Sequence, residues 1–97
     1  MEKVFLVTSF SSFDFESHVK TNVYANYDAA KERFESLADN IKLQLKNNFD
    51  EVSVNDYDEF ADAIFIKRET YAEGYQTGRA AEFGLWVKLE EVEVEVE

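Results

Sequence analysis

The clearest repeating pattern in this chain is an apolar stripe with helical spacing. Its positions are separated by four, three, four and four residues, and they are Ala30, Phe34, Leu37, Ile41 and Leu45. This spacing predicts an amphipathic helix over about residues 27–47. Asn26 precedes the stripe as a candidate N-cap, because its side chain can accept a hydrogen bond from a free amide of the first turn.

Two strand-like segments precede this helix. Residues 3–9 are apolar on both alternating faces, which is typical of a central strand. Residues 19–25 alternate between apolar and polar side chains, which predicts a strand with one buried face. We interpret the intervening residues 10–16 as a loop or a wide hairpin connection.

The segments that follow the helix are less regular. Residues 52–54 fit a short strand, and residues 63–70 fit another strand. Residues 71–84 contain all three glycines of the chain, so we expect a long connection there.

The last strand-like segment, residues 83–96, changes its phase. Leu85, Val87 and Leu89 share one parity, whereas Val92 and its alternate neighbours share the other. A regular strand cannot place both sets on one face, so we expect a bulge or a strand break at Glu90-Glu91.

These elements together predict the α+β class. We expect residues 1–97 to form a single domain with an antiparallel sheet of about four strands. The expected order along the chain is strand, strand, helix, strand, strand, with the amphipathic helix packed on one face of the sheet.

Composition supports a folded core and restricts the chemistry. Of the 97 residues, 45% are hydrophobic and 15% are aromatic, unlike disordered acidic chains, which are poor in aromatic residues. Cysteine is absent, which excludes disulfides, thiolate zinc sites and catalytic thiols. We expect a cytoplasmic protein, because no leader pattern or apolar run of membrane-spanning length stands out.

The negative charge is concentrated in the second half of the chain. Residues 1–49 contain seven acidic and six basic side chains, and residues 50–97 contain fourteen acidic and four basic side chains. Almost all of the formal net charge of −11 therefore belongs to the second half. Direct binding to nucleic acid or to anionic membranes is disfavoured, since both require clustered lysine and arginine. A basic protein surface is the expected partner.

Six acidic residues without an intervening base form the first candidate site. A calcium loop of the EF-hand type would need a glycine at position 6 and a glutamate at position 12, and neither possible starting aspartate provides them. The remaining interpretations are another cation site, a patch for a basic partner and a solvated loop. The six residues are Asp50, Glu51, Asp56, Asp58, Glu59 and Asp62.

The acidic C-terminal run forms the second candidate site. In an extended strand, Glu91, Glu93, Glu95 and Glu97 would line one face at intervals of about 6.5–7 Å. Such a row has about half the charge density of one nucleic-acid strand, and together with the acidic loop it could imitate nucleic acid. The alternative is a terminal strand whose charges prevent sheet-to-sheet association.

Aromatic residues accompany the acidic ones, and Tyr71 and Tyr75 in particular could be partly exposed in the expected connection. Tyrosine is a favoured anchor residue at protein interfaces, although core packing would account for the same residues. His18 is the chain's single histidine, and its nearby carboxylates, Asp14 and Glu16, belong to a segment that we expect to be a loop, so the sequence aligns no catalytic partner with it. We identify no catalytic residue, cofactor site or metal site.

Three segments resemble small orphan proteins of bacteriophages and of mobile elements of gut bacteria. They are the opening strand KVFLVT at residues 3–8, the strand-to-helix junction VYANYDAA at residues 23–30 and the closing acidic strand at residues 89–97. The resemblance concerns structural segments, so it transfers no functional residue. It implies an accessory or interaction role.

We therefore expect a non-enzymatic protein-interaction module that presents an acidic surface to a basic partner. An inhibitor that imitates nucleic acid is the narrower form of this hypothesis. One alternative is a small ligand-binding domain or enzyme with carboxylates in a shallow cleft. Another alternative is a structural homodimer formed through exposed strand edges.

Overall fold

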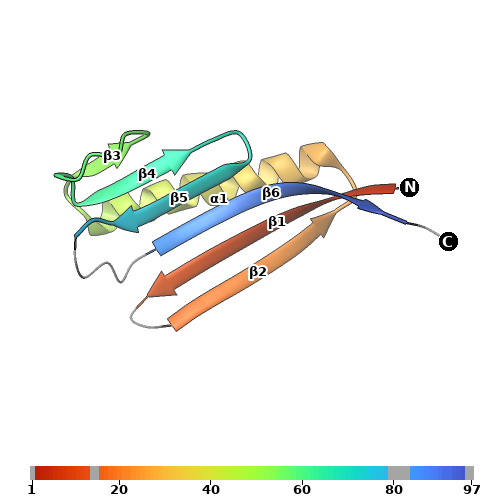
Figure 1. Cartoon of the computed structure of the whole chain (residues 1–97), viewed down its shortest axis with the longest axis horizontal. Coiled ribbons are helices and arrows are strands. Elements are labelled where there is room, and N and C mark those ends of the chain that lie inside the picture. The colour runs from red at the N-terminus through yellow and green to blue at the C-terminus, as the bar shows by residue number, and fades with distance from the viewer. Residues whose placement is uncertain (1, 14–15, 79–83, 96–97) are drawn as a thin grey trace.

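The described part of the chain forms a six-stranded sheet with one helix on one of its faces (Figure 1). The computed structural model of the chain describes residues 2–13, 16–78 and 84–95. The elements in chain order are β1 (Glu2–Phe13), β2 (Glu16–Tyr24), α1 (Tyr27–Asn48), β3 (Val52–Val54), β4 (Ala63–Lys67), β5 (Tyr71–Gln76) and β6 (Gly84–Val94).

The strands lie in the order β2-β1-β6-β5-β4-β3. All neighbouring strands are antiparallel except β3 and β4, which are parallel. The expected α+β class is confirmed, but the expectation of about four antiparallel strands is wrong in detail. The sheet has six strands and is mixed, because β3 joins its edge in the parallel sense and β5 adds a strand.

Helix α1 forms where the apolar stripe predicts it. The Asn26 side chain accepts a hydrogen bond from the Ala29 amide at 3.2 Å, which caps the first turn. At the other end, the Phe49 amide donates to the Leu45 carbonyl oxygen at 2.9 Å. The buried face of the helix consists of Ala30, Phe34, Ala38, Ile41 and Leu45, and Leu37 is half-buried beside it.

The sequence predicts a long connection in the glycine-containing segment after β4, but part of this segment is a strand. Residues Tyr71–Gln76 form β5, a strand between β4 and β6. Ala72 and Gly74 are buried there under α1, where a larger side chain would hold the helix away from the sheet. Glycine in this strand therefore marks a close approach of helix and sheet and does not mark a turn.

The predicted bulge in the last strand is also wrong. Strand β6 pairs with β1 in one unbroken register, from Gly84 opposite Ser12 to Val94 opposite Glu2. The change of phase reflects a change in which face is apolar. Leu85, Val87 and Leu89 belong to the core under α1, whereas Val92 and Val94 lie on the opposite face; Val96 is outside the described residues.

The single described helix is too narrow to cover one whole face of this sheet. An α-helix with its side chains is about 10–12 Å wide, whereas six strands at about 4.8 Å spacing span about 24 Å. The core cluster accordingly joins α1 to the middle strands, through Val7 of β1, Phe65 of β4, Ala72 of β5 and Val87 of β6.

The other face of β2, β1 and β6 has no described element packed on it. We call it the uncovered face. Directly paired residues share a face, so the registers assign its members. They are Glu2, Val4, Leu6, Thr8, Phe10 and Ser12 of β1, Ser17, Val19, Thr21 and Val23 of β2, and Gly84, Trp86, Lys88, Glu90, Val92 and Val94 of β6.

We expect Gly74→Ala to destabilise the fold. A Cβ atom at this position would lie 2.6 Å from Leu45 Cδ1 and 2.7 Å from Ile41 Cγ2, so the helix must shift or repack. Overpacking of this kind costs about 1–3 kcal/mol. Chemical denaturation should show this loss for Gly74→Ala. The matched variant Gly84→Ala, whose Cβ meets nothing within 4 Å, should retain the parent stability, and an equal loss in both variants would contradict this explanation.

Candidate functional site

The six acidic residues of the first candidate site lie in one stretch of backbone between α1 and β4. We call residues 50–62 the acidic loop; it contains the short strand β3. Hydrogen bonds between side chains and the backbone hold its shape. The Asp62 carboxylate accepts a hydrogen bond from the Glu51 amide at 3.0 Å, and the Asp58 carboxylate accepts one from the Phe60 amide at 3.0 Å. All six acidic side chains are exposed, as expected for a loop that faces solvent.

None of these six carboxylates forms a salt bridge within 4.0 Å to a base in the described part of the chain. The acidic loop itself contains no lysine or arginine. It therefore carries six negative charges within thirteen residues that no described cation neutralises at close range. Such a segment is a source of attractive potential for a positively charged partner.

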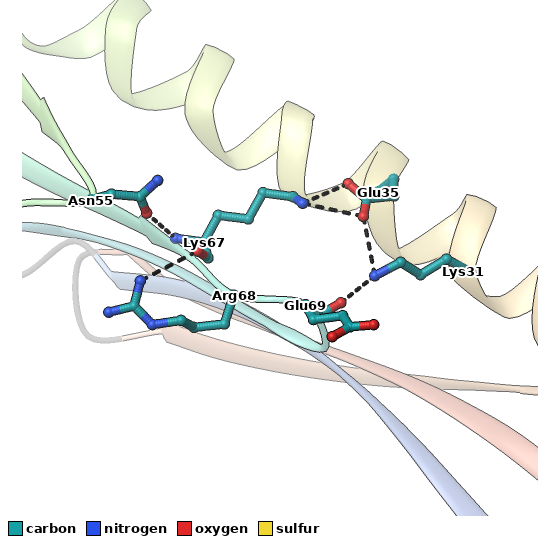
Figure 2. A network of polar contacts seen from close by, with 6 residues as sticks. All are labelled: Lys31, Glu35, Asn55, Lys67, Arg68 and Glu69. Carbon is teal, nitrogen blue, oxygen red and sulfur yellow. Dashed lines mark hydrogen bonds and ion pairs between the residues drawn. The ribbon is translucent and has the colours of Figure 1, made fainter.

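Two lysines, one on the helix and one on β4, are instead paired with a carboxylate on the helix, as Figure 2 shows. Lys67 of β4 lies 2.8 Å from Glu35 Oε2, and Lys31 of α1 lies 3.2 Å from Glu35 Oε1. Lys31 also donates a hydrogen bond to the carbonyl oxygen of Glu69. These contacts connect the helix to β4 and to the turn that follows it, and they occupy the lysines.

Asn55 connects the acidic loop to the same strand (Figure 2). Its side-chain oxygen accepts a hydrogen bond from the Lys67 amide at 2.7 Å, and its own amide donates to the Phe65 carbonyl oxygen at 2.7 Å. The backbone of Asn55 has a φ of 56°, in the left-handed region that asparagine tolerates better than most residues. Asn55 therefore turns the chain after β3 and fixes the start of the second acidic run.

The C-terminal glutamates lie at the other end of the sheet. Glu91 pairs with Phe5 of β1, whereas the acidic loop adjoins the start of β4, which is level with the start of β6. The seven residue steps from Gly84 to Glu91 correspond to roughly 23 Å along the strand. The structure thus separates the two acidic groups that the sequence placed in one candidate patch.

The C-terminal group is also partly neutralised. Lys3 Nζ lies 3.5 Å from Glu91 Oε1, and both side chains are about half-exposed. Glu93 and Glu95 are exposed without a described ion pair, and Glu97 is outside the described residues. The acidic loop is therefore the larger group of unpaired charge.

The two candidate tyrosines lie on β5, on the side away from the helix. Tyr71 Oη donates a hydrogen bond to Glu73 Oε2 at 3.0 Å. Burial and this contact with the Glu73 carboxylate raise the pKa of Tyr71 to about 12. Burial also raises the pKa of Tyr75, with a smaller contribution from Glu73. Both hydroxyls therefore remain protonated donors at neutral pH.

Tyr75 is brought together with the acidic loop. A cavity of about 590 Å³ is lined by Tyr75 and Ile64 from the sheet and by Tyr57, Glu59 and Phe60 from the acidic loop. Phe60 is 86% exposed and Tyr57 is 62% exposed. Neither of these two aromatic residues is predicted as a site residue from the sequence, in which the available signal is a bulky aromatic residue within an acidic, solvated run.

A second cavity, of about 280 Å³, lies between α1 and the β1–β2 hairpin. Its polar lining includes His18, Lys20, Asn40 and Gln44, beside the apolar residues Leu37, Ile41, Leu85 and Val87, and none of the described carboxylates lines it. The His18 ring lies 3.9 Å from the Glu16 carboxylate, and both side chains are largely exposed.

Within residues 2–13, 16–78 and 84–95, no group of three or more histidine, cysteine, aspartate or glutamate side chains is arranged to hold a metal ion. No helix of these residues combines the length and the apolar character needed to cross a bilayer.

We expect Glu35→Gln to lower stability in a pH-dependent way. The hydrogen bond from Lys67 is the largest influence on Glu35 and lowers the pKa of its carboxyl below 4.5, with partial burial opposing it and Lys31 adding to it. The stabilisation that the ionised Glu35 carboxylate gains from the two lysines is therefore present at neutral pH, and it is lost as the pH falls through the lowered pKa of Glu35.

Because Glu35 is more than a third exposed, the loss at pH 7 should be about 0.5–1 kcal/mol. Denaturation of the parent chain and of Glu35→Gln between pH 7 and pH 3 measures it, with Glu32→Gln on the exposed side of α1 as the control. A difference that persists unchanged at pH 3 would rule out this ionic origin.

Comparison with known proteins yields no relative from which a role could be transferred. Neither protein-family models, curated proteins nor solved structures match this chain. Nothing in these comparisons bears on the resemblance to small phage and mobile-element proteins, which remains an expectation. A function for this chain is therefore inferred from its own residues, geometry and charge.

Proposed function

We propose that this chain is a non-enzymatic protein-interaction module that binds a basic partner protein through the acidic loop. The observation that carries the proposal is the set of six exposed carboxylates without a described ion pair. Long-range attraction from such a group increases the rate of encounter with a cationic surface. We expect the interaction to occur in the cytoplasm, since a chain without cysteine suits a reducing compartment.

Exposed aromatic residues allow the acidic loop to contribute binding energy at direct contact, in addition to long-range electrostatic attraction. Phe60 and Tyr57 stand beside Tyr75 and Glu59 around one cavity. Buried aromatic residues contribute much of the binding energy at protein interfaces, whereas rim charges mainly guide association. The acidic loop combines both kinds of group within a single segment.

Imitation of nucleic acid is the narrower form of this proposal. In it, the module occupies the nucleic-acid site of a DNA-binding or RNA-binding protein and inhibits it. The acidic loop supports this form better than the C-terminal row does, because Lys3 pairs with Glu91 in that row. The row then contributes a secondary field at the opposite end of the sheet.

A binding role also accounts for the cavities better than carboxylate chemistry does. Among the described residues, the cavity beside the β1–β2 hairpin has no carboxylate in its lining, and Glu59 is the one carboxylate around the cavity at the acidic loop. A pair of carboxylates in a cleft, which general acid–base catalysis would use, is not formed by these linings.

We expect the triple variant Asp56→Asn, Asp58→Asn, Glu59→Gln to lose its partner. Affinity capture from the native host's lysate, with the parent chain at low salt, should retain basic proteins that the triple variant does not retain. Raising the salt to about 0.5 M should release them, because the screening length then falls to a few ångströms. Quantitative mass spectrometry of the eluates measures both effects.

The matched control removes the same number of charges at the opposite end of the sheet, as Glu91→Gln, Glu93→Gln, Glu95→Gln. It should capture the same basic proteins as the parent chain. The proposal would be refuted if the loop variant retained the basic proteins as well as the parent chain does. It would also be refuted if raising the salt concentration did not weaken their binding.

A further inference from the structure

We propose that the uncovered face binds a second copy of this chain, so that two sheets pack face to face. This inference goes beyond the acidic loop and does not depend on it. Its basis is the arrangement of apolar and charged residues on β2, β1 and β6, together with the flat shape of the single chain.

The alternation of β6 is the first observation. An antiparallel sheet with one packed face usually turns its polar residues towards solvent on the other face. Beyond Leu89, β6 does the reverse: Val92 and Val94 lie on the uncovered face, and Glu91 and Glu93 lie on the helix side. Apolar residues are thus placed on a face for which the described chain supplies no cover.

The other two strands continue this apolar surface. Val19 and Val23 of the edge strand β2 are 65% and 63% exposed. Phe10 of β1 stacks on Trp86 of β6, with ring centroids 5.5 Å apart and planes at 13°. Surfaces of this kind on a single chain commonly mark a contact with another protein.

Charge indicates what this other protein is. From Glu2 to Phe10, Val19 to Val23 and Trp86 to Val94, the charged residues on the uncovered face are Glu2, Lys88 and Glu90. Lys88 and Glu90 form an ion pair at 2.8 Å, and Lys88 also lies over the Trp86 ring at 5.5 Å. The face thus carries one net negative charge on a chain of net charge −11, so it offers little to a strongly basic or acidic partner and repels its own copy only weakly.

Size and shape are compatible with a stable dimer. Strands β2, β1 and β6 present a projected area of about 500 Å². The accessible area of a face covered with side chains is larger than its projection, which brings it closer to the about 800 Å² per partner of a standard interface. The chain measures 52 × 25 × 19 Å with a radius of gyration of 15.1 Å. A compact domain of this length would have about 12–13 Å, so a face-to-face pair replaces an elongated slab by a thicker body.

The chain's single tryptophan lies within this face and reports on the contact. Light scattering after size-exclusion chromatography, over a concentration range of about 5–500 μM, should show a monomer–dimer equilibrium. Over the same range, Trp86 emission should shift to the blue and its quenching by acrylamide should decrease, because the second sheet excludes water from the ring.

The double variant Val19→Lys, Val23→Lys should weaken self-association at least about tenfold, since four lysines would be buried in the dimer. Leu43→Lys is the matched control, because Leu43 is 57% exposed on α1, away from this face. It should dimerise like the parent chain. Circular dichroism confirms that each variant is folded; if the double variant is not, Val94→Lys at the end of β6 takes its place.

Salt separates this inference from the proposed function. Two copies bring together twice the net charge of −11, so screening should strengthen self-association, whereas it should weaken binding at the acidic loop. The loop variant should dimerise normally. Two results would overturn the inference. One is a chain that stays monomeric up to about 500 μM. The other is a dimer that persists in both face variants with unchanged Trp86 quenching, as pairing through the β2 edge would give.

Discussion

The packing of one helix on a sheet twice its width determines the rest of this structure. Helix α1 buries its stripe from Ala30 to Leu45 against the middle strands, and Gly74 lets it approach β5 closely. This contact makes the hydrophobic core, and the width of the helix limits how far that core extends. The hairpin end of β2 and β1 is left beside a cavity on the helix side, and no described element packs on their other face.

Polar contacts follow from the same packing. Lys31 and Lys67 flank the helix–sheet seam, where Glu35 pairs with both of them and Phe34 lies beneath their ammonium groups at 5.0 and 5.9 Å. Two of the chain's few lysines are thus used to fasten the helix to β4. The carboxylates of the acidic loop lie outside this seam and keep their charge exposed, which is the physical origin of the surface proposed to bind a basic partner.

The charged and apolar surfaces have different places in the fold and different energetics. The acidic loop acts at a distance through its field, whereas the uncovered face acts only at contact through the removal of apolar area from water. The acidic loop adjoins the β4–β3 edge of the sheet, whereas the uncovered face extends over β2, β1 and β6 towards the opposite edge. Each surface can thus be engaged without a change in the backbone of the other.

Local signals in the sequence determined the helix, its Asn26 cap, the α+β class and the exposure of the six loop carboxylates, because periodicity, capping and solvation depend on neighbouring residues. They misjudged β5, since Gly74 resembles a turn signal until Leu45 and Ile41 are placed above it. They also misjudged β6, where a change of face resembled a bulge. Tertiary structure alone decided the strand order, the Lys3–Glu91 pair and the separation of the two acidic groups, because each of these depends on segments that are distant in the chain and meet only on folding.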